Sequence, residues 1–279
     1  MKRPADILFP GKLSRALTLS YDDGMETDIR MMEILDRYGL KCTFNLNSGL
    51  YAPEGTVYPA GTIHRRMSRS QIDKAYHAPH EISTHALTHP WINRLPDNRI
   101  AYEIVKDREN LEEEFGCIVR GHAYPYGVFD DRVVDILHRS GIAYARTVIS
   151  SHRFDLPRDW LRLEATCHHN DPELPNLIER FLAEERFFQQ PKFFYIWGHS
   201  YEFDQFNNWD LLEDLASKLG GRDDVWYCTN IEAYDYIEAF RALIFSLDGE
   251  QVCNPAALEV CFRCEGEAYS VRPGETIKL

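Results

Sequence analysis

The sequence contains no long uncharged apolar segment and no excess of basic residues. No apolar run approaches the roughly 18–20 residues that a membrane span requires, so we expect no membrane-spanning helix. Its 279 residues include 31 Lys and Arg against 44 Asp and Glu, a formal net charge of −13 at pH 7. Nucleic-acid phosphates and anionic membrane surfaces both attract basic surfaces. We therefore expect neither nucleic acid nor a membrane among the partners.

The sequence also leads us to expect neither paired cysteines nor an N-terminal leader. The chain has seven cysteines, an odd number, and four of them stand singly in apolar surroundings, which argues against a disulfide framework. Cys261 and Cys264 have zinc-like spacing, but no downstream Cys or His pair completes such a site. No apolar segment follows the basic pair Lys2-Arg3, as a signal peptide requires. We expect reduced thiols and a cytoplasmic protein.

Short β-like runs alternate with helical patterns along most of the chain, which predicts βα units, a largely parallel sheet and an α/β fold class. The expected strands cover residues 16–20, 42–46, 81–84, 118–123, 143–147, 160–163, 193–197 and 225–228. The expected helices cover residues 27–38, 97–115, 130–139, 174–188, 209–219 and 231–245. Seven or eight strands, each followed by a helix or a loop, favour a barrel over an open sheet.

Two segments depart from this alternation. Residues 51–67 hold glycines and prolines at turn-like positions and predict an excursion with β-character. Toward the C-terminus, residues 258–262 alternate apolar and polar side chains, and residues 272–275 (Arg-Pro-Gly-Glu) are typical of a turn. We expect one barrel domain over residues 1–246, and a small antiparallel β-appendage over residues 247–279. The appendage covers a barrel edge or, as the less favoured alternative, binds a ligand.

Two adjacent carboxylates, Asp22 and Asp23, follow the first expected strand. Barrels of this type carry their active sites at the C-terminal ends of their strands. Side chains alternate along an extended segment, so one carboxylate can bind a metal ion while its neighbour faces a substrate. The alternative is that both residues serve only as the acidic start of the helix that begins near Thr27.

Two histidines, His85 and His89, follow another expected strand at a spacing of four residues, with Pro90 directly after them. On a helical turn such histidines point the same way, as ligands of a divalent metal must. The spacing alone is weak, because 11 histidines in 279 residues give roughly 0.4 such pairs by chance. With Asp23, however, the pair would form a two-His, one-carboxylate site with open positions for water and substrate.

Two further strand ends carry candidate groups. Residues 123–127 (Ala-Tyr-Pro-Tyr-Gly) predict a tight turn that can present a backbone N–H to a developing oxyanion, and without other context they are an ordinary turn. His199 ends the most apolar strand, where a lone histidine is more often a core residue. Asp159, next to Trp160 and after an expected loop, is the candidate that orients His199 and raises its pKa.

Taken together and in this order, these segments resemble the polysaccharide deacetylase family, carbohydrate esterase family four. The family's motifs are an Asp-Asp pair, His-x-x-x-His-Pro, Arg-x-Pro-Tyr, an Asp-Trp segment and a late Leu-x-His. The matching positions lie between about residues 16 and 200, and they are Asp22-Asp23, His85–Pro90, residues 123–126, Asp159-Trp160 and residues 197–199. Ala123 stands in place of the Arg, and Trp197 in place of the Leu. The resemblance implies a distorted (β/α)7 barrel and metal-dependent hydrolysis of an amide.

The resemblance also implies a role for each matching residue. The metal, Zn²⁺ or another divalent ion such as Co²⁺, Ni²⁺ or Mn²⁺, is bound by Asp23, His85 and His89. Asp22 is the general base, and His199 protonates the leaving amine with Asp159 as its orienting partner. The backbone N–H of Tyr126 shares the oxyanion with the metal. The side chains expected to bind the substrate are Tyr124, Pro125, Trp160, Trp197 and Tyr201.

Ala123 leaves Asp22 without the Arg that orders it in the family, and Arg120, His122 or Arg146 could substitute from nearby. The first hypothesis is a deacetylase of an N-acetylated sugar or glycan fragment. The second is the same chemistry on a non-sugar C–N bond (an imide, formamide or ureide), which the expected cytoplasmic location and Ala123 favour. The third is a carbohydrate-binding barrel without catalysis, supported directly by Ala123 alone. The expected partner is a small-molecule or oligosaccharide substrate, and the sequence makes no prediction of the oligomeric state.

Overall fold

The computed structural model describes residues 5–184 and 190–279. In it, parallel strands form a closed barrel with seven strand positions, one of which is shared by two short strands, β7 and β8. The barrel strands are β2 (Arg15–Asp22), β3 (Thr43–Leu46), β4 (Glu81–Thr84), β5 (Gly121–Ala123), β6 (Tyr144–Ser150), β7 (Leu163–Ala165), β8 (Cys167–His168) and β9 (Lys192–Gly198). They follow the order β7-β6-β5-β4-β3-β2-β9-β8. The short strand β10 (Trp226–Tyr227) pairs with the start of β2.

The short strands β7 and β8 are two halves of one interrupted strand, which closes the barrel. β7 pairs with β6, and β8 pairs with β9. Between them, the Thr166 carbonyl accepts the His152 N–H at 2.9 Å, and the Thr166 N–H donates to the Tyr195 carbonyl at 2.8 Å. One segment thus joins both edges of the sheet, and the distorted (β/α)7 barrel expected from the sequence is confirmed.

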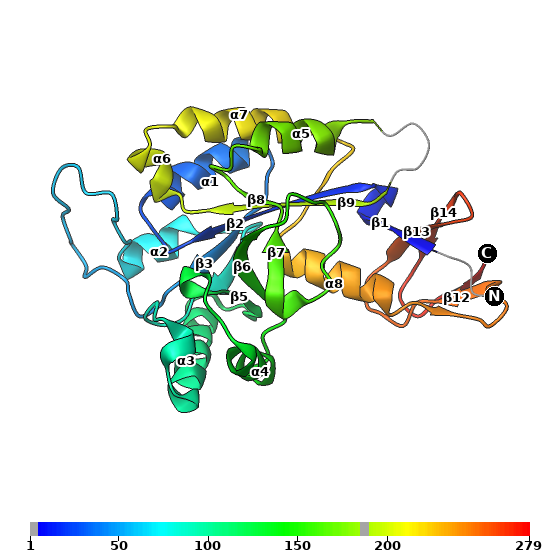
Figure 1. The fold of residues 1–279 in the computed structure, drawn as a ribbon, viewed down its shortest axis with the longest axis horizontal. Helices are drawn as coiled ribbons and strands as arrows, with labels where there is room; N and C mark the ends of the chain where they lie inside the picture. The colour runs from blue at the N-terminus through cyan, green and yellow to red at the C-terminus, as the bar shows by residue number, and fades with distance from the viewer. Residues whose placement is uncertain (1–4, 185–189) are drawn as a thin grey trace.

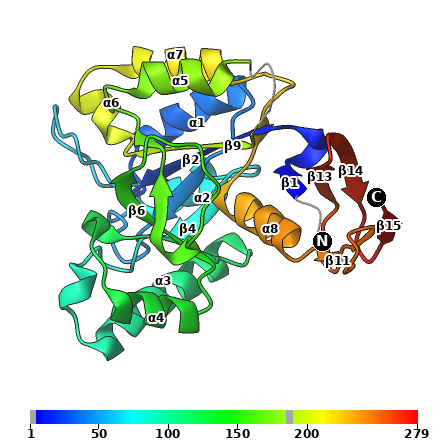
Figure 2. The same cartoon turned by 45° about the vertical axis from the view of Figure 1, so that its right-hand side comes forward.

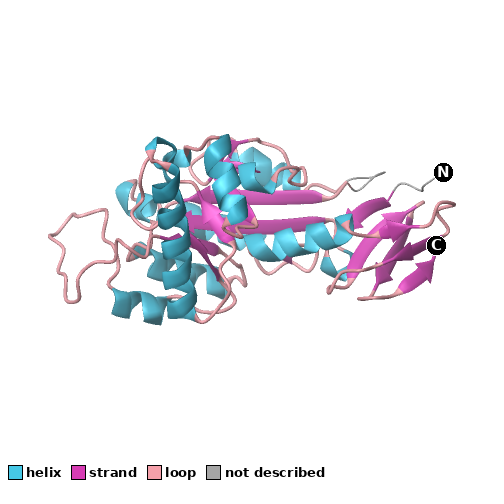
Figure 3. Cartoon of the chain, turned by 90° about the horizontal axis from the view of Figure 1, so that it is seen from below, coloured by secondary structure: helices cyan, strands magenta, loops and turns pink. Residues whose placement is uncertain are grey.

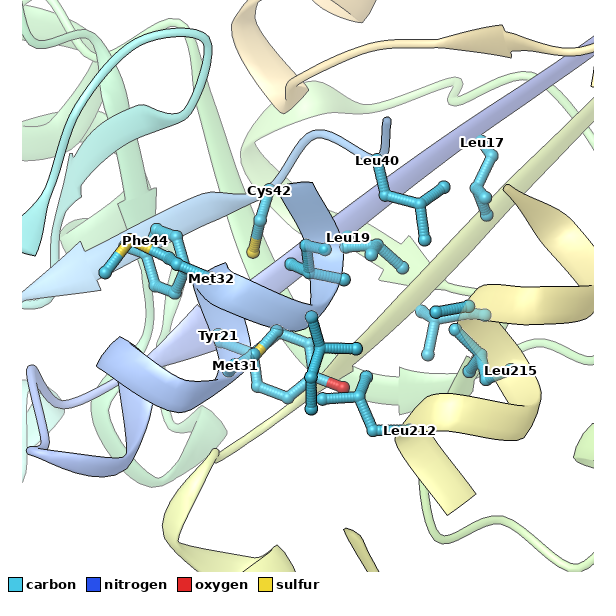
Figure 4. Close-up of a cluster of buried hydrophobic side chains, with 14 of the residues drawn as sticks. Leu17, Leu19, Tyr21, Met31, Met32, Leu40, Cys42, Phe44, Leu212 and Leu215 are labelled. Atoms are coloured by element: carbon cyan, nitrogen blue, oxygen red, sulfur yellow. The ribbon is translucent and has the colours of Figure 1, made fainter. Parts of the chain in front are cut away.

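Helices surround this barrel (Figure 1). They are α1 (Thr27–Arg37), α2 (Arg69–Ala75), α3 (Asp97–Phe115), α4 (Asp131–Arg139), α5 (Leu174–Leu182), α6 (Tyr201–Gln205), α7 (Trp209–Leu219) and α8 (Asn230–Arg241). In Figure 4, Met31 and Met32 of α1 lie in the same buried cluster as Leu19 of β2 and Leu215 of α7. Burying these side chains anchors α1 against the strand that ends in Asp22. Within residues 5–184 and 190–279, no helix combines the length and the apolar character needed to cross a membrane.

Several local predictions differ from the structure. The strand expected at residues 160–163 begins instead as a 3-10 turn, because the Asp159 side chain accepts the Leu161 N–H at 3.0 Å and caps it. Residues 51–67 contain turns and isolated bridges rather than strands. The helix expected over residues 174–188 ends at Leu182, and its last expected residues, 185–188, lie outside the described residues. The helices α2 and α6 were not predicted, because each is only five to seven residues long.

Both ends of the chain contribute to a small antiparallel β-structure beside the barrel (Figures 2 and 3). Its strands are β1 (Ala5–Leu8), β11 (Ile244–Phe245), β12 (Gln251–Cys253), β13 (Val260–Cys264), β14 (Glu267–Val271) and β15 (Thr276–Lys278). They form two sheets, β1-β13-β14 and β11-β12-β15. Tyr236 of α8 connects them to the barrel, because its hydroxyl donates to the Leu8 carbonyl at 2.7 Å and accepts the Cys261 N–H at 2.9 Å. The participation of β1 was not predicted, and the domain boundary after residue 246 stays a prediction.

Candidate active site

A cavity of about 270 Å³ lies where the C-terminal ends of several barrel strands meet. The residues that line it are Asp22, Asp23, His85, His89, Tyr124, Tyr126, Val148, Trp197, His199 and Tyr201. The parallel ladder brings them together, since β2 pairs with both β3 and β9, and β5 pairs with both β4 and β6. Every lining residue except Val148 is a candidate site residue of the sequence.

Three of these residues form a cluster suited to a divalent metal. One donor atom each of Asp23, His85 and His89 lies within 4.8 Å of the other two, and Asp23 Oδ1 is 3.8 Å from His89 Nε2. The Nδ1–H of His85 donates to the Ala123 carbonyl at 2.7 Å, which leaves the Nε2 lone pair available to a metal. Burial lowers the pKa of His85 and lowers that of His89 to about 4. Both imidazoles are therefore neutral at pH 7, as metal ligands must be.

The two histidines lie on a loop after β4, so the expected helical turn was wrong. Ala86 and His89 have φ angles of 60° and 50°, which belong to the left-handed region and interrupt any helix. Side chains from elsewhere hold this loop. Asp107 of α3 accepts the His85 N–H at 3.2 Å, and Asn47 donates to the Ala86 carbonyl at 2.7 Å. Tertiary contacts, rather than helical geometry, therefore orient both imidazoles.

Asp22 is paired with Arg146, one of the three candidates for the arginine that Ala123 replaces. The Arg146 guanidinium donates to Asp22 Oδ2, and Asn45 donates to Oδ1 at 2.8 Å. Ala123 and Arg146 are direct partners in the β5–β6 ladder, so the arginine occupies the neighbouring strand instead of the family's position. Burial acts to raise the pKa of Asp22, but the charges of Arg146 and nearby histidines outweigh it and hold that pKa well below its usual value.

The other two candidates for the missing arginine have different partners. Arg120 pairs with Asp235 of α8 at 2.9 Å, and His122 Nδ1 forms a hydrogen bond with the Thr84 hydroxyl at 2.8 Å. The guanidinium of Arg146 also lies 4.3 Å from the ring centroid of Trp197. Because a planar guanidinium packs on an aromatic face better than the ammonium of a lysine, this contact favours arginine at position 146.

His199 lies opposite Asp22, with 3.9 Å between His199 Nε2 and Asp22 Oδ2. Its other ring nitrogen, Nδ1, is 3.5 Å from Glu202 Oε2. Burial acts to lower the pKa of His199, but Glu202 and Asp22 outweigh it, so the pKa is raised above its ordinary value. Sequence reasoning gave Glu202 no role, although its spacing of three residues from His199 was a usable signal.

Two candidates, Asp159 and Trp160, are not among the residues that line this cavity. The Asp159 carboxylate accepts from Arg162 at 2.7 Å and from the Leu161 N–H, so it does not orient His199. Trp160 packs against Tyr234 in a buried cluster and donates its Nε1–H to Glu238 at 2.7 Å, and its expected contact with substrate stays a prediction.

The turn after β5 contributes one wall of the cavity. Within Pro125–Gly127, Tyr126 adopts a φ of 56° and Gly127 a φ of 67°. The Tyr126 ring stacks on Trp91 with centroids 4.6 Å apart. Tyr124 lines the cavity while its hydroxyl donates to the Leu161 carbonyl at 2.7 Å. Pro125 is buried in the turn and is not among the lining residues, and its expected contact with substrate stays a prediction.

Parts of the chain are similar in sequence to known proteins. Residues 11–145 match the family model described as polysaccharide deacetylase. Over 127 residues the chain is 28% identical to the uncharacterized protein YlxY of Bacillus subtilis (strain 168), which covers 46% of this chain and only 35% of that protein's length.

Solved structures share the fold at low sequence identity. A putative polysaccharide deacetylase from Mycobacterium smegmatis has a TM-score of 0.60 at 16% identity, covering 86% of this chain and 96% of that one. The Xyl-CE4 domain of a multidomain xylanase from the hindgut metagenome of Trinervitermes trinervoides has a TM-score of 0.52 at 16% identity, covering 81% and 92%. The match of residues 11–145 to the polysaccharide deacetylase family model agrees with the resemblance that the order of the motifs predicted.

Proposed function

We propose that this protein is a metal-dependent hydrolase that removes the N-acetyl group from an N-acetylated sugar or glycan fragment. One observation carries the proposal: Asp22 and His199 face each other across 3.9 Å in the cavity that also holds the Asp23, His85 and His89 cluster. A base, an acid and a metal site are the groups that amide hydrolysis uses. The family match supports deacetylation of a carbohydrate as the reaction class.

The donor set fits Zn²⁺ or a similar divalent ion such as Co²⁺, Ni²⁺ or Mn²⁺. Asp23 supplies a carboxylate, while His85 and His89 supply neutral imidazoles, and three protein ligands leave positions open for water and substrate. When bound, the ion supplies a Lewis acid that activates water and polarises the acyl carbonyl.

The chain's own residues then perform the proton transfers. Asp22 is ionised and held by Arg146 and Asn45, so its free lone pairs can accept a proton from the attacking water. His199 donates its Nε2 proton to the nitrogen of the leaving amine, which takes the electron pair of the broken C–N bond. The backbone N–H of Tyr126 stabilises the oxyanion that develops in between.

The cavity favours a small reacting group. Its volume of about 270 Å³ lies just below the roughly 300–1,000 Å³ typical of small-molecule sites. Trp197 and Tyr201 supply aromatic walls that suit a sugar ring, and Val148 supplies an apolar one. The same small volume also suits a non-sugar imide, formamide or ureide, which is the second candidate. The contact of Arg146 with Asp22 argues against a non-catalytic barrel, for which Ala123 is the only direct support.

The test is amine and acetate release from N-acetylglucosamine oligomers by the metal-loaded protein. We expect Asp22→Asn and His199→Ala each to lower kcat by about 10²- to 10⁴-fold, while Asp210→Asn, an exposed carboxylate on α7, leaves kcat unchanged. Unaltered turnover in both active-site variants would refute the proposed roles. Hydrolysis of imides with none of N-acetylhexosamines would establish the second candidate, and tight sugar binding without hydrolysis would establish the third.

A further inference from the structure

The Glu202 carboxylate lies among three histidines at the edge of the cavity. Its Oε2 is 3.5 Å from His199 Nδ1, 3.1 Å from His168 Nε2 and 3.3 Å from His169 Nε2. The fold brings these residues together from two strands. His168 and His169 lie at the end of β8, which pairs with β9 and places His168 opposite Trp197. Glu202 lies in the first turn of α6, the helix that follows His199.

This cluster has the composition of a metal site, but its hydrogen bonds argue against one. Donor atoms of His168, His199 and Glu202 lie within 4.8 Å of one another. However, the Asn170 N–H donates to His168 Nδ1 at 3.1 Å, so Nδ1 carries the lone pair of the neutral ring and Nε2 carries its proton. A protonated Nε2 cannot bind a metal. It donates to Glu202 instead, and thereby fixes the carboxylate.

Glu202 holds His199 at two points. The backbone N–H of His199 donates to Glu202 Oε2 at 3.2 Å, and the same oxygen lies 3.5 Å from Nδ1 of the ring, an ion-pair distance rather than a formed hydrogen bond. A carboxylate at Nδ1 selects the tautomer in which Nδ1 carries a proton and orients the imidazole. In this orientation Nε2 is directed toward Asp22. Burial acts to raise the pKa of Glu202, but His168 and His199 outweigh it and lower that pKa, so the carboxylate is ionised.

We infer that Glu202 is the positioning residue of His199, accepting its Nδ1–H and holding Nε2 toward the reacting amine, while His168 holds Glu202. The inference rests on the proposed function, because it takes His199 as the acid. During the reaction only the Nε2 proton moves, to the leaving nitrogen, and Glu202 stays ionised. It therefore occupies the role that sequence reasoning gave to Asp159.

The test must separate Glu202 from the other groups around His199. Those groups are the carboxylates of Asp22 and Asp23 and the rings of His168, Trp197 and Tyr201. Glu202→Gln keeps the shape of the side chain and removes only its charge. The matched control is Asp171→Asn, which removes a carboxylate that pairs with His152 at 2.7 Å outside the cavity.

The expected signature depends on the leaving group. On an N-acetylated oligosaccharide, we expect Glu202→Gln to lower kcat about 10- to 100-fold, which is part of the full contribution of a general acid, with KM changed less than about twofold. The high-pH limb of the kcat profile moves to lower pH, because the carboxylate that raises the pKa of His199 is gone. On 4-nitrophenyl acetate, whose leaving group needs no proton, the loss shrinks to within about threefold. His168→Ala acts in the same direction and more weakly, and bound metal stays at the wild-type level.

Each result has a defined meaning. An equal loss on amide and ester, or a Glu202→Gln variant that behaves like Asp171→Asn, overturns the inference. If the wild-type protein releases no amine from any substrate, the proposed function fails. In that case the His199 imidazole is titrated by NMR in the wild-type and Glu202→Gln proteins. A lower pKa in the variant upholds the contact with Glu202, and an unchanged pKa overturns it.

Discussion

Replacing Arg146 by methionine removes the charge that faces Asp22 but keeps much of the aliphatic stem beside Trp197. The side chains of Arg146 and Asp22 are 1% and 3% exposed. Losing one partner of a buried ion pair typically costs about 3–5 kcal/mol, because the other charge stays buried without compensation. We therefore expect Arg146→Met to lower the free energy of unfolding by about that amount at pH 7, measured by urea denaturation.

The pH dependence of the stability loss shows whether the unpaired Asp22 carboxylate causes it. In the wild-type protein its folded pKa lies below the ordinary value, so the pair stabilises the fold above roughly pH 4 and loses this effect as pH falls through the folded pKa. In Arg146→Met, burial raises the Asp22 pKa, so the ionised carboxylate destabilises the fold at neutral pH and protonation relieves it. The difference in stability between the two proteins should narrow from pH 7 toward pH 4.

Two double variants provide controls for this reasoning. Asp22→Asn with Arg146→Met removes both charges, and we expect it to recover most of the lost stability. Ala123→Arg with Arg146→Ala exchanges two side chains that are direct ladder partners, which conserves total volume and returns the arginine to the family's position. We expect the exchange to recover part of the kcat lost in Arg146→Ala. A stability loss under about 1 kcal/mol at pH 7, or one that does not change with pH, would refute the reasoning.

Three further outcomes are expected. Asp159→Asn should leave kcat within about twofold of wild type and the free energy of unfolding within about 1 kcal/mol, because the ion pair of Asp159 with Arg162 is half-exposed. A large loss of kcat would instead support the contact of Asp159 with His199 predicted from the sequence. Gly127→Ala should lower kcat and destabilise the fold by about 1–3 kcal/mol. The reason is that Gly127 has a φ of 67°, and a Cβ at this position would lie 2.3 Å from Val148 Cγ2. A variant with wild-type kinetics and melting temperature would contradict the role of this turn. Removal of bound metal with a chelator should abolish amine release and lower the melting temperature, because the ion binds only the folded chain; turnover that persists in metal-free protein would contradict metal dependence.

The barrel and most of the cavity could be predicted because their signals are local. Alternating strands and helices predict the fold, and residues at strand ends such as Asp22 and His85 converge in any closed parallel barrel. Arg146 was one of three candidates, and choosing it required the register of β5 against β6, which is a non-local property. The contact of His199 with Glu202 was missed because the family's motif order favoured Asp159. The pairing of β1 with β13 joins residues about 250 positions apart, and no local pattern reports such a pairing.

The interrupted strand formed by β7 and β8 has a consequence for the order of folding. The hydrogen bonds of Thr166 join His152 and Arg153 on one side to Tyr195 on the other, so this junction forms only after segments distant in the sequence meet. Such non-local pairing is slow. The same junction places His168 opposite Trp197, and a slip of one residue would turn its imidazole to the opposite face of the sheet. Completion of the barrel and assembly of the histidine cluster are therefore one event, and during refolding hydrolytic activity should return only with the final, junction-closing phase.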